Sequence, residues 1–159
     1  MQDKHFLSLR KVRAISDYQF GPEITDILLN ECKDIRIENS KNTSRIRYVY
    51  LQDELMLSLR PTNGFLTLGI KAAQKIIKKT KVPKLRAIVL SEISDFIKKG
   101  RNVFCKHIID IDNNLRPLDE VIVVNQDDEI LAIGRLKIPV DYVKVFKNGV
   151  AINVRKGSN

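Results

Sequence analysis

Cysteine, histidine and tryptophan are scarce in this chain of 159 residues, which has two cysteines, two histidines and no tryptophan. Cys32 and Cys105 lie far apart and outside any C-x-x-C pair, so their spacing predicts neither a zinc site nor a redox pair. We expect both to be small buried hydrophobic residues in a reducing compartment. His5 and His107 form no spaced ligand set, and His107, inside the apolar run FCKHIIDI, is expected to be structural. No metal site is therefore predicted.

Long hydrophobic runs are also missing. No stretch reaches the roughly eighteen uninterrupted apolar residues that a membrane span needs. The N-terminal sequence MQDKHFLSLRKVR has no long apolar segment after its charges, unlike a secretory signal peptide. These absences predict a cytoplasmic protein with no membrane partner.

The sequence patterns of common catalytic and cofactor sites are absent as well. There is no Walker-type glycine loop, G-x-G-x-x-G, G-x-S-x-G or H-E-x-x-H. Carboxylates gather at Asp110 and Asp112 and at residues 127–129, but a strand end and a hairpin turn favour aspartate for local reasons. Catalysis would require these groups to converge in one pocket. We expect no cofactor, and no catalysis by this chain alone.

What the chain has in excess is positive charge. The formal net charge is +9, with 14 basic and 9 acidic residues up to Thr80 and 14 basic and 10 acidic residues after it. The excess is therefore spread over the whole chain, and the pI of about 9.6 is typical of nucleic-acid-binding domains. A lysine-rich solvated surface, as in thermophile proteins, would give the same balance. Charge alone leaves these two interpretations open.

The first half of the sequence predicts helices and a hairpin. Residues 6–18 could form a basic helix, and GPEITDILLN (21–30) predicts a second helix with Gly21 and Pro22 at its start. RIRYVYL (45–51) and ELMLSLR (54–60) predict a hairpin because only two residues separate them. The leucines at 55, 57 and 59 are expected on one face of the second strand.

KAAQKIIKK (71–79) predicts an amphipathic helix with alanines and isoleucines on its inner side. The lysines at 71, 75, 78 and 79 form one basic stripe, which is more often the solvated face of a helix than a ligand contact. Pro83 prevents the helix from continuing. We therefore expect two domains, 1–82 and 83–159.

The second half predicts the order β-α-β-β-β-α-β, typical of a small mixed barrel. After the strand RAIVL, Ser91 is expected to cap a short helix whose buried stripe is Ile93, Phe96 and Ile97. NVFCKHIIDI (102–111) is expected to be one strand, followed by VIVVN, EILAIGRLKI, a helix that opens at Pro139, and the strand VAINVRK.

The segment Lys98-Lys99-Gly100-Arg101-Asn102 joins the end of that helix to the next strand. A glycine lets a phosphate or base approach the backbone, and the flanking cations supply affinity through counterion release. An ordinary lysine-rich helix end, closed by a left-handed glycine, explains the same residues. The segment is thus a candidate RNA site with a structural alternative.

Residues 86–157 resemble the PUA domain, which is named for pseudouridine synthases and archaeosine transglycosylases. The matching stretches are FIKKGRNVF (96–104), LRPLDEVIVVN (115–125), AIGR (132–135) and FKNGVAINVRKG (146–157). The first half resembles the domain that precedes PUA in archaeosine tRNA-guanine transglycosylases, through DYQFG (17–21), SRIRYVYLQDELMLSLRP (44–61) and NGFLTL (63–68). The resemblance implies an α+β protein, with a small α/β N-terminal domain followed by a PUA-type mixed β pseudo-barrel.

In that family the PUA domain grips the acceptor stem and single-stranded 3′ end of tRNA. The resemblance places its groove at the helix end and the following strand, with two cations nearby on the last strand. The RNA-binding residues that it implies are Lys98, Lys99, Gly100, Arg101, Asn102, Val103, Lys106, Arg155 and Lys156. One departure is Leu118, where the family usually has glycine, and it bears on the local turn.

The resembling transglycosylases also carry a catalytic barrel of about 250 residues, with a zinc site, that 159 residues cannot hold. Because the chain starts with Met1, we expect a free-standing product, although a fragment is the alternative. The resemblance implies the tRNA-binding subunit of a split archaeosine transglycosylase, beside a separate catalytic chain. The alternatives are an independent PUA-type RNA-binding factor in translation or in ribosome or tRNA metabolism, and a protein-interaction module without RNA.

Overall fold

The computed structural model describes residues 2–30 and 33–159, and their contacts divide the chain into two compact units, Met1–Lys79 and Thr80–Asn159. The predicted boundary at Pro83 lies a few residues beyond this division and stays a prediction. Each unit has its own sheet and its own buried core. Cys32 lies outside the described residues.

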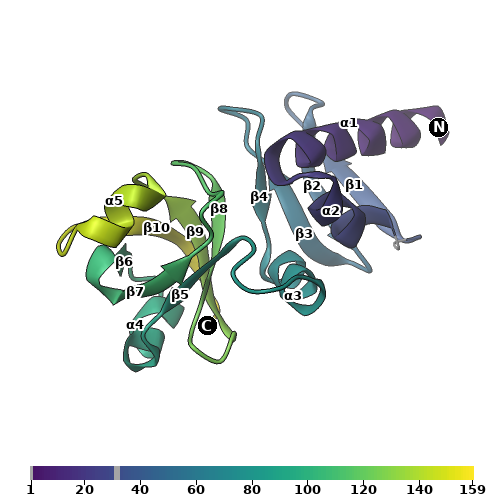
Figure 1. Ribbon diagram of the computed structural model, residues 1–159. Coiled ribbons are helices and arrows are strands. Elements are labelled where there is room, and N and C mark those ends of the chain that lie inside the picture. The colour runs from purple at the N-terminus through teal and green to yellow at the C-terminus, as the bar shows by residue number, and fades with distance from the viewer. Residues whose placement is uncertain (1, 31–32) are drawn as a thin grey trace. The chain divides into compact units, whose positions relative to one another are not determined.

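The first unit is a four-stranded antiparallel sheet with helices against it (Figure 1). The strands β1 (Ile35–Asn39), β2 (Ile46–Leu51), β3 (Glu54–Leu59) and β4 (Leu66–Leu68) follow one another in space as in sequence. The helices are α1 (Gln2–Phe20), α2 (Pro22–Thr25), which continues into the π-helical turn Asp26–Asn30, and α3 (Ile70–Lys79). The predicted helices over 6–18 and 71–79 are confirmed, and the first is longer than predicted.

The hairpin between β2 and β3 is also confirmed, and its geometry explains the two-residue loop. Gln52 and Asp53 both have positive φ, 50° and 62°, as a type I′ turn requires. The strict alternation predicted for β3 is wrong, because Val49 pairs with Leu57 while Tyr50 pairs with Leu55. Met56 is the extra residue of this bulge, so Met56 and Leu57 are both buried, whereas Leu55 is 37% exposed.

The second unit is a six-stranded mixed sheet, in the order β6-β10-β9-β8-β5-β7, that curls into a nearly closed barrel. Its strands are β5 (Arg86–Val89), β6 (Val103–Phe104), β7 (Ile108–Ile111), β8 (Glu120–Val124), β9 (Ile130–Leu136) and β10 (Val150–Gly157). Only the β5–β8 pair is parallel. The helices α4 (Ser94–Lys98) and α5 (Val140–Val145) lie at opposite ends of the barrel (Figure 1).

Three details of the second unit differ from the sequence prediction. The single strand predicted over 102–111 is two short strands separated by the 3-10 turn Cys105–His107. Ser91 does not cap α4: it begins the 3-10 turn Ser91–Ile93, and its backbone carbonyl accepts a hydrogen bond from Ser94 Oγ at 2.7 Å. Ile97 is buried as predicted, but Phe96 is 62% exposed.

Leu118 occupies a turn whose geometry favours glycine. Asp119 N donates to Arg116 O at 3.0 Å, and Pro117 and Leu118 are the two central residues. Leu118 has φ 75°, the value that a type II turn requires at its third residue. Its side chain is 71% exposed. The family preference for glycine here therefore has a conformational cause, and the leucine keeps the same turn.

Replacing Leu118 with glycine should stabilise the protein. A left-handed leucine costs about 1–2 kcal/mol, and glycine loses about 0.5–1 kcal/mol through its extra freedom when unfolded. We expect the free energy of unfolding to rise by about 0.5–1 kcal/mol, measured by urea denaturation. Leu118→Ala is the control, because alanine keeps the positive-φ penalty. A loss of stability in Leu118→Gly would contradict the argument.

Candidate nucleic-acid interface

The end of α4 is a sharp corner built by a Schellman motif. Gly100, with φ 91°, follows the helix, and its N–H donates to Ile97 O at 2.9 Å while Arg101 N donates to Phe96 O at 3.2 Å. A Cβ at Gly100 would meet no atom within 4 Å. The space in front of the glycine is therefore open, and Lys99, Gly100 and Arg101 are exposed around it.

The C-terminal end of β10 packs directly against this corner. A Cβ at Gly157 would come within 2.0 Å of Lys98 O, so only glycine fits the approach of the two backbones. Asn102 Oδ1 accepts a hydrogen bond from Val154 N at 2.9 Å, and Val103 pairs with Ile152 in the sheet. The structure thus brings Lys98–Asn102 together with residues 154–157, and Val103 serves as a buried anchor of the corner.

The two predicted cations of β10 lie on the same stretch but in different surroundings. Arg155 Nη2 lies 2.9 Å from Glu120 Oε2, a carboxylate that is 2% exposed. One side of the Arg155 guanidinium therefore neutralises a buried acid, whatever else it binds. Lys156 is exposed next to it.

Lys106 lies away from the corner. It belongs to the 3-10 turn that follows β6, and the neighbouring Cys105 N donates to Gly149 O at 3.0 Å. Gly149 precedes β10, whereas the Lys98 corner packs at Gly157, the other end of that eight-residue strand. Lys106 follows Arg101 by five residues, so their Cα atoms lie at most about 17–18 Å apart. The structure places Lys106 beside the start of β10, whereas Lys98 lies beside its end.

An exposed aromatic residue beside the corner was missed by the sequence prediction. Phe96 lies on α4 three residues before Lys99, the residue at the C-terminal cap, and this spacing places two side chains on the same face of a helix. A phenylalanine in an amphipathic pattern is typical of a core, which is why it was predicted to be buried. The next residue, Ile97, is buried and fills the core position. Phe96 therefore remains exposed to solvent.

Three of the carboxylates considered for catalysis have structural roles. Asp112, 5% exposed, accepts hydrogen bonds from Leu85 N at 2.8 Å and Asn114 N at 3.0 Å. Asp128 binds the buried guanidinium of Arg86, and Glu129 accepts from Asn125 Nδ2. Within residues 2–30 and 33–159, no group of three or more acidic, histidine or cysteine side chains could hold a metal ion.

Cys105 is 3% exposed, and burial raises the pKa of its thiol. The thiol is therefore protonated near neutral pH and is a poor nucleophile. His107 packs edge-on against Phe104, with ring centroids 6.2 Å apart. Both residues thus behave structurally. No described helix combines the length and apolar character needed to cross a membrane.

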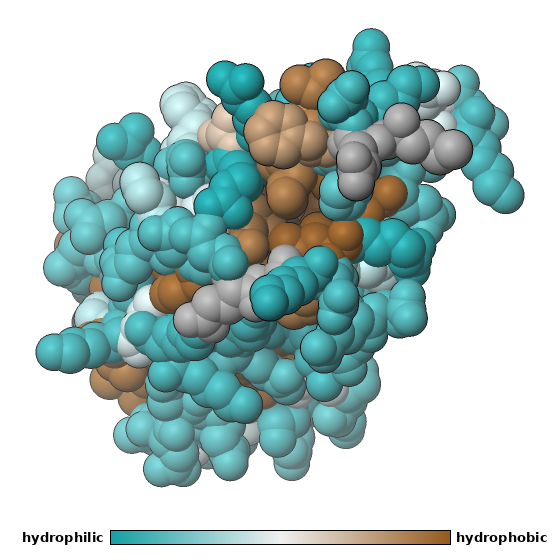
Figure 2. All heavy atoms as spheres, turned by 90° about the vertical axis from the view of Figure 1, so that its right-hand side faces the viewer, coloured by the Kyte–Doolittle hydropathy of each residue, from teal (hydrophilic) through white to brown (hydrophobic). Residues whose placement is uncertain are grey.

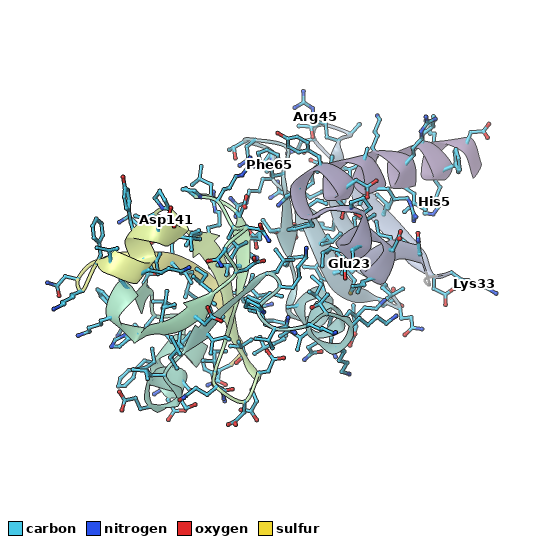
Figure 3. All side chains as sticks on the ribbon, in the orientation of Figure 1. His5, Glu23, Lys33, Arg45, Phe65 and Asp141 are labelled. Carbon is cyan, nitrogen blue, oxygen red and sulfur yellow. The ribbon has the colours of Figure 1, made fainter. Side chains whose placement is uncertain are left out.

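The first unit exposes charged and aromatic side chains of its own. Lys71 on α3 pairs with Glu54 at 3.2 Å, so the basic stripe is bound in part to the sheet. On α1, Phe6 is 64% and Leu7 52% exposed, and Figure 2 shows hydrophobic side chains framed by hydrophilic ones on the side of the N-terminus. Tyr18 stacks on Phe65, which projects from the turn before β4 (Figure 3).

Comparison with known families matches two consecutive domains along the chain. Residues 10–83 match the patch-forming domain C2 of tRNA-guanine transglycosylase, and residues 86–157 match the PUA domain. Among curated proteins, the tRNA-guanine(15) transglycosylase of Methanothermobacter thermautotrophicus is 42% identical over 149 residues, and that of Methanocaldococcus jannaschii is 40% identical. These matches cover 94% and 92% of this chain but only 22% of each relative.

Solved structures agree with the fold. A hypothetical protein from Pyrococcus horikoshii aligns over 96% of this chain and 90% of its own, with a TM-score of 0.76 and 24% identity. A conserved PUA domain protein from Thermoplasma acidophilum aligns over 77% of this chain and 75% of its own, with a TM-score of 0.59 and 18% identity. The predicted α+β class and the PUA-type barrel are thereby confirmed.

Proposed function

This chain is a PUA-domain protein that carries, ahead of its PUA domain, the patch-forming C2 domain of tRNA-guanine transglycosylases, and on that premise we propose that it is the non-catalytic, tRNA-binding subunit of a split archaeosine transglycosylase. The observation that carries the proposal is the pair of domains, matched in the family order over nearly the whole chain. A role in RNA binding and tRNA modification is the broader statement that this pair supports.

The corner of α4 supports the RNA-binding part. Lys98, Lys99 and Arg101 surround an open glycine, and Phe96 offers a stacking surface beside them. Unpaired nucleotides are recognised by such combinations of cations, stacking side chains and exposed backbone amides. The ligand proposed for this corner is the acceptor stem of tRNA with its single-stranded 3′ end.

The non-catalytic part rests on the roles of the carboxylates and thiol. Asp112 and Asp128 are engaged in holding the barrel together, and Cys105 is buried. Base exchange in tRNA would therefore be the work of a separate chain. This subunit would contribute phosphate contacts, which supply affinity and fix the register of the RNA.

Binding of tRNA should fall steeply with salt and should depend on the 3′ end. If about five phosphates are neutralised, the logarithm of the binding constant should fall against the logarithm of salt with a slope of about −3.5 to −4.5. Filter binding with a transcript lacking the terminal CCA is the matched control, and it should bind clearly more weakly, because free bases offer edges that a paired helix hides. Absence of tRNA binding even at low salt would refute the RNA-binding proposal.

The split-enzyme proposal is tested by mixing this chain with the catalytic transglycosylase chain of the same cell. Docking makes the second set of RNA contacts intramolecular, so the apparent KM for tRNA should fall about tenfold or more, with a smaller change in kcat. Incorporation of labelled guanine into tRNA is the measurement, and this chain alone should incorporate none. If the catalytic chain gains nothing, an independent RNA-binding factor takes the place of the split subunit.

A further inference from the structure

The second unit has a surface groove lined by lysines and bordered by exposed aromatic rings. It has a volume of about 500 Å³ and lies between the segment from Cys105 to Ile111 and residues 143–147, at the end of α5 and in the loop that follows. This volume falls within the range of small-ligand pockets, about 300–1,000 Å³. Val143 and Ile111 form its buried floor, at 3% and 1% exposure. The groove is therefore a surface concavity with a buried apolar floor.

Three lysines and one carboxylate line the groove. Lys106 comes from the 3-10 turn, Lys144 from α5 and Lys147 from the loop that follows it, and Asp110 lies on β7. All four are exposed. Lys144 Nζ also donates to Asn113 Oδ1. The lining thus carries an excess of two positive charges.

Beside these lysines, α5 presents an aromatic pair to solvent. The rings of Tyr142 and Phe146 are stacked, with centroids 5.4 Å apart and planes 14° from parallel. Tyr142 is 52% and Phe146 49% exposed, and Phe146 itself lines the groove. Figure 3 labels Asp141 at the start of the same helix. Folding of the barrel does not explain why two large rings remain half uncovered.

We propose that this groove is a second RNA site, which takes an unstacked nucleotide of a single-stranded segment. A base would continue the stack on Phe146, and the flanking phosphates would lie against Lys106, Lys144 and Lys147. Aromatic rings with adjacent cations are the means by which proteins hold single strands irrespective of sequence. Lysines in excess over acids favour a polyanion over an apolar peptide.

The groove lies at the opposite end of β10 from the Lys98 corner, because Cys105 N bonds to Gly149 O whereas Lys98 O meets Gly157. A strand that reached both sites would have to pass along the barrel between them. The inference rests on the proposed RNA binding, but it assigns a separate surface. Its residues can therefore be changed without touching the corner.

The test uses the full chain and two fluorescent probes, a short single-stranded oligoadenylate and tRNA. Tyr142→Ala with Phe146→Ala should weaken oligoadenylate binding about tenfold or more, as expected for the loss of one stacked base. Tyr142→Phe with Phe146→Tyr keeps both rings and should bind like the unaltered chain. Lys144→Gln with Lys147→Gln should make the salt slope shallower by about 1.4 for a single strand. Circular dichroism checks that each variant folds.

The outcomes separate this site from the general proposal. If the unaltered chain binds both probes and the alanine variant binds equally well, the groove is not an RNA site while the proposed function stands. If the unaltered chain binds neither probe at low salt, RNA binding as a whole is refuted. If the alanine variant keeps RNA binding but loses its effect on the separate catalytic chain, the groove docks a protein and the RNA assignment is wrong.

Discussion

Replacing Arg86 with leucine is expected to remove about 3–5 kcal/mol from the free energy of unfolding. The guanidinium is completely buried on β5. Its Nε and Nη2 donate to the carboxylate of Asp128 at 2.8 and 3.2 Å. Its Nη1 donates to Thr80 Oγ1 and to the carbonyls of Lys81 and Lys84, at 3.1 to 3.2 Å. One side chain thus binds the segment that leads into the barrel to the β8–β9 hairpin.

Leucine would fill part of the volume but would remove the hydrogen bonds that Arg86 donates to Thr80 Oγ1 and to the carbonyls of Lys81 and Lys84. An unpaired buried polar group costs about 1–3 kcal/mol, and several are created together. Asp128 contributes less, because its side chain is 32% exposed and can be hydrated. Most of the loss should therefore come from the lost hydrogen bonds to residues 80–84, and the ion pair should be the smaller part.

Asp128→Asn is the matched control for this argument. It removes the charge of the partner but keeps an acceptor for Arg86, so it should cost clearly less than Arg86→Leu. Arg86→Lys keeps the charge but cannot reach several acceptors at once, and it should fall between the two. Urea denaturation followed by circular dichroism gives the three values. Equal losses for Arg86→Leu and Asp128→Asn would show that the ion pair alone carries the effect.

Arg86 also marks a limit of sequence analysis. In RAIVL the arginine is typical of the polar first residue of a strand. Nothing nearby in the sequence indicates that its charge is buried. Its partner Asp128 lies 42 positions away in a turn where aspartate is common for local reasons. A buried ion pair of this kind depends on which turns the fold brings together. Periodicity within one segment therefore cannot predict it.

Patterns that depend on one segment were predicted well. The helix over 71–79 has its alanines and Ile76 at 0% exposure, because period and apolar content agree there. The left-handed glycine after α4 also follows from local rules, and Gly100 has φ 91°. The bulge at Met56 and the exposure of Phe96 were missed, since both are set by neighbouring strands and helices.

The candidate site was predicted in part, and the resemblance contributed more to it than the charge pattern. Lys98–Asn102 and the end of β10 come together as the family groove implies. The resemblance also implied Lys106, which the 3-10 turn after β6 places beside the start of β10. A turn that interrupts an expected strand changes the direction of every side chain that follows it in the sequence.

The corner itself provides the second large effect. Lys98→Glu together with Arg101→Glu should weaken tRNA binding by at least about 2 kcal/mol, roughly thirtyfold. The change removes two cations that neutralise phosphates and places two carboxylates where phosphates would lie. The salt slope should also become shallower, by about 0.7–0.9 for each phosphate that is no longer neutralised. Filter binding at several salt concentrations measures both quantities.

The control must change the net charge by the same amount in another place, because a less basic protein binds RNA more weakly at any site. Lys41→Glu with Lys78→Glu meets this condition. Both lysines are exposed, Lys41 in the turn after β1 and Lys78 on the basic stripe of α3. The loss of tRNA affinity that the two double variants share then measures the long-range attraction. The difference between their losses measures the direct contribution of Lys98 and Arg101 to binding. At 0.15 M salt, exposed charges more than about 8 Å apart are screened. If Lys98 and Arg101 contact phosphates directly, the difference in affinity between the two double variants should therefore remain large at that salt concentration. If the two variants lose equal affinity at that salt, while circular dichroism shows both folded, the RNA does not bind at Lys98 and Arg101.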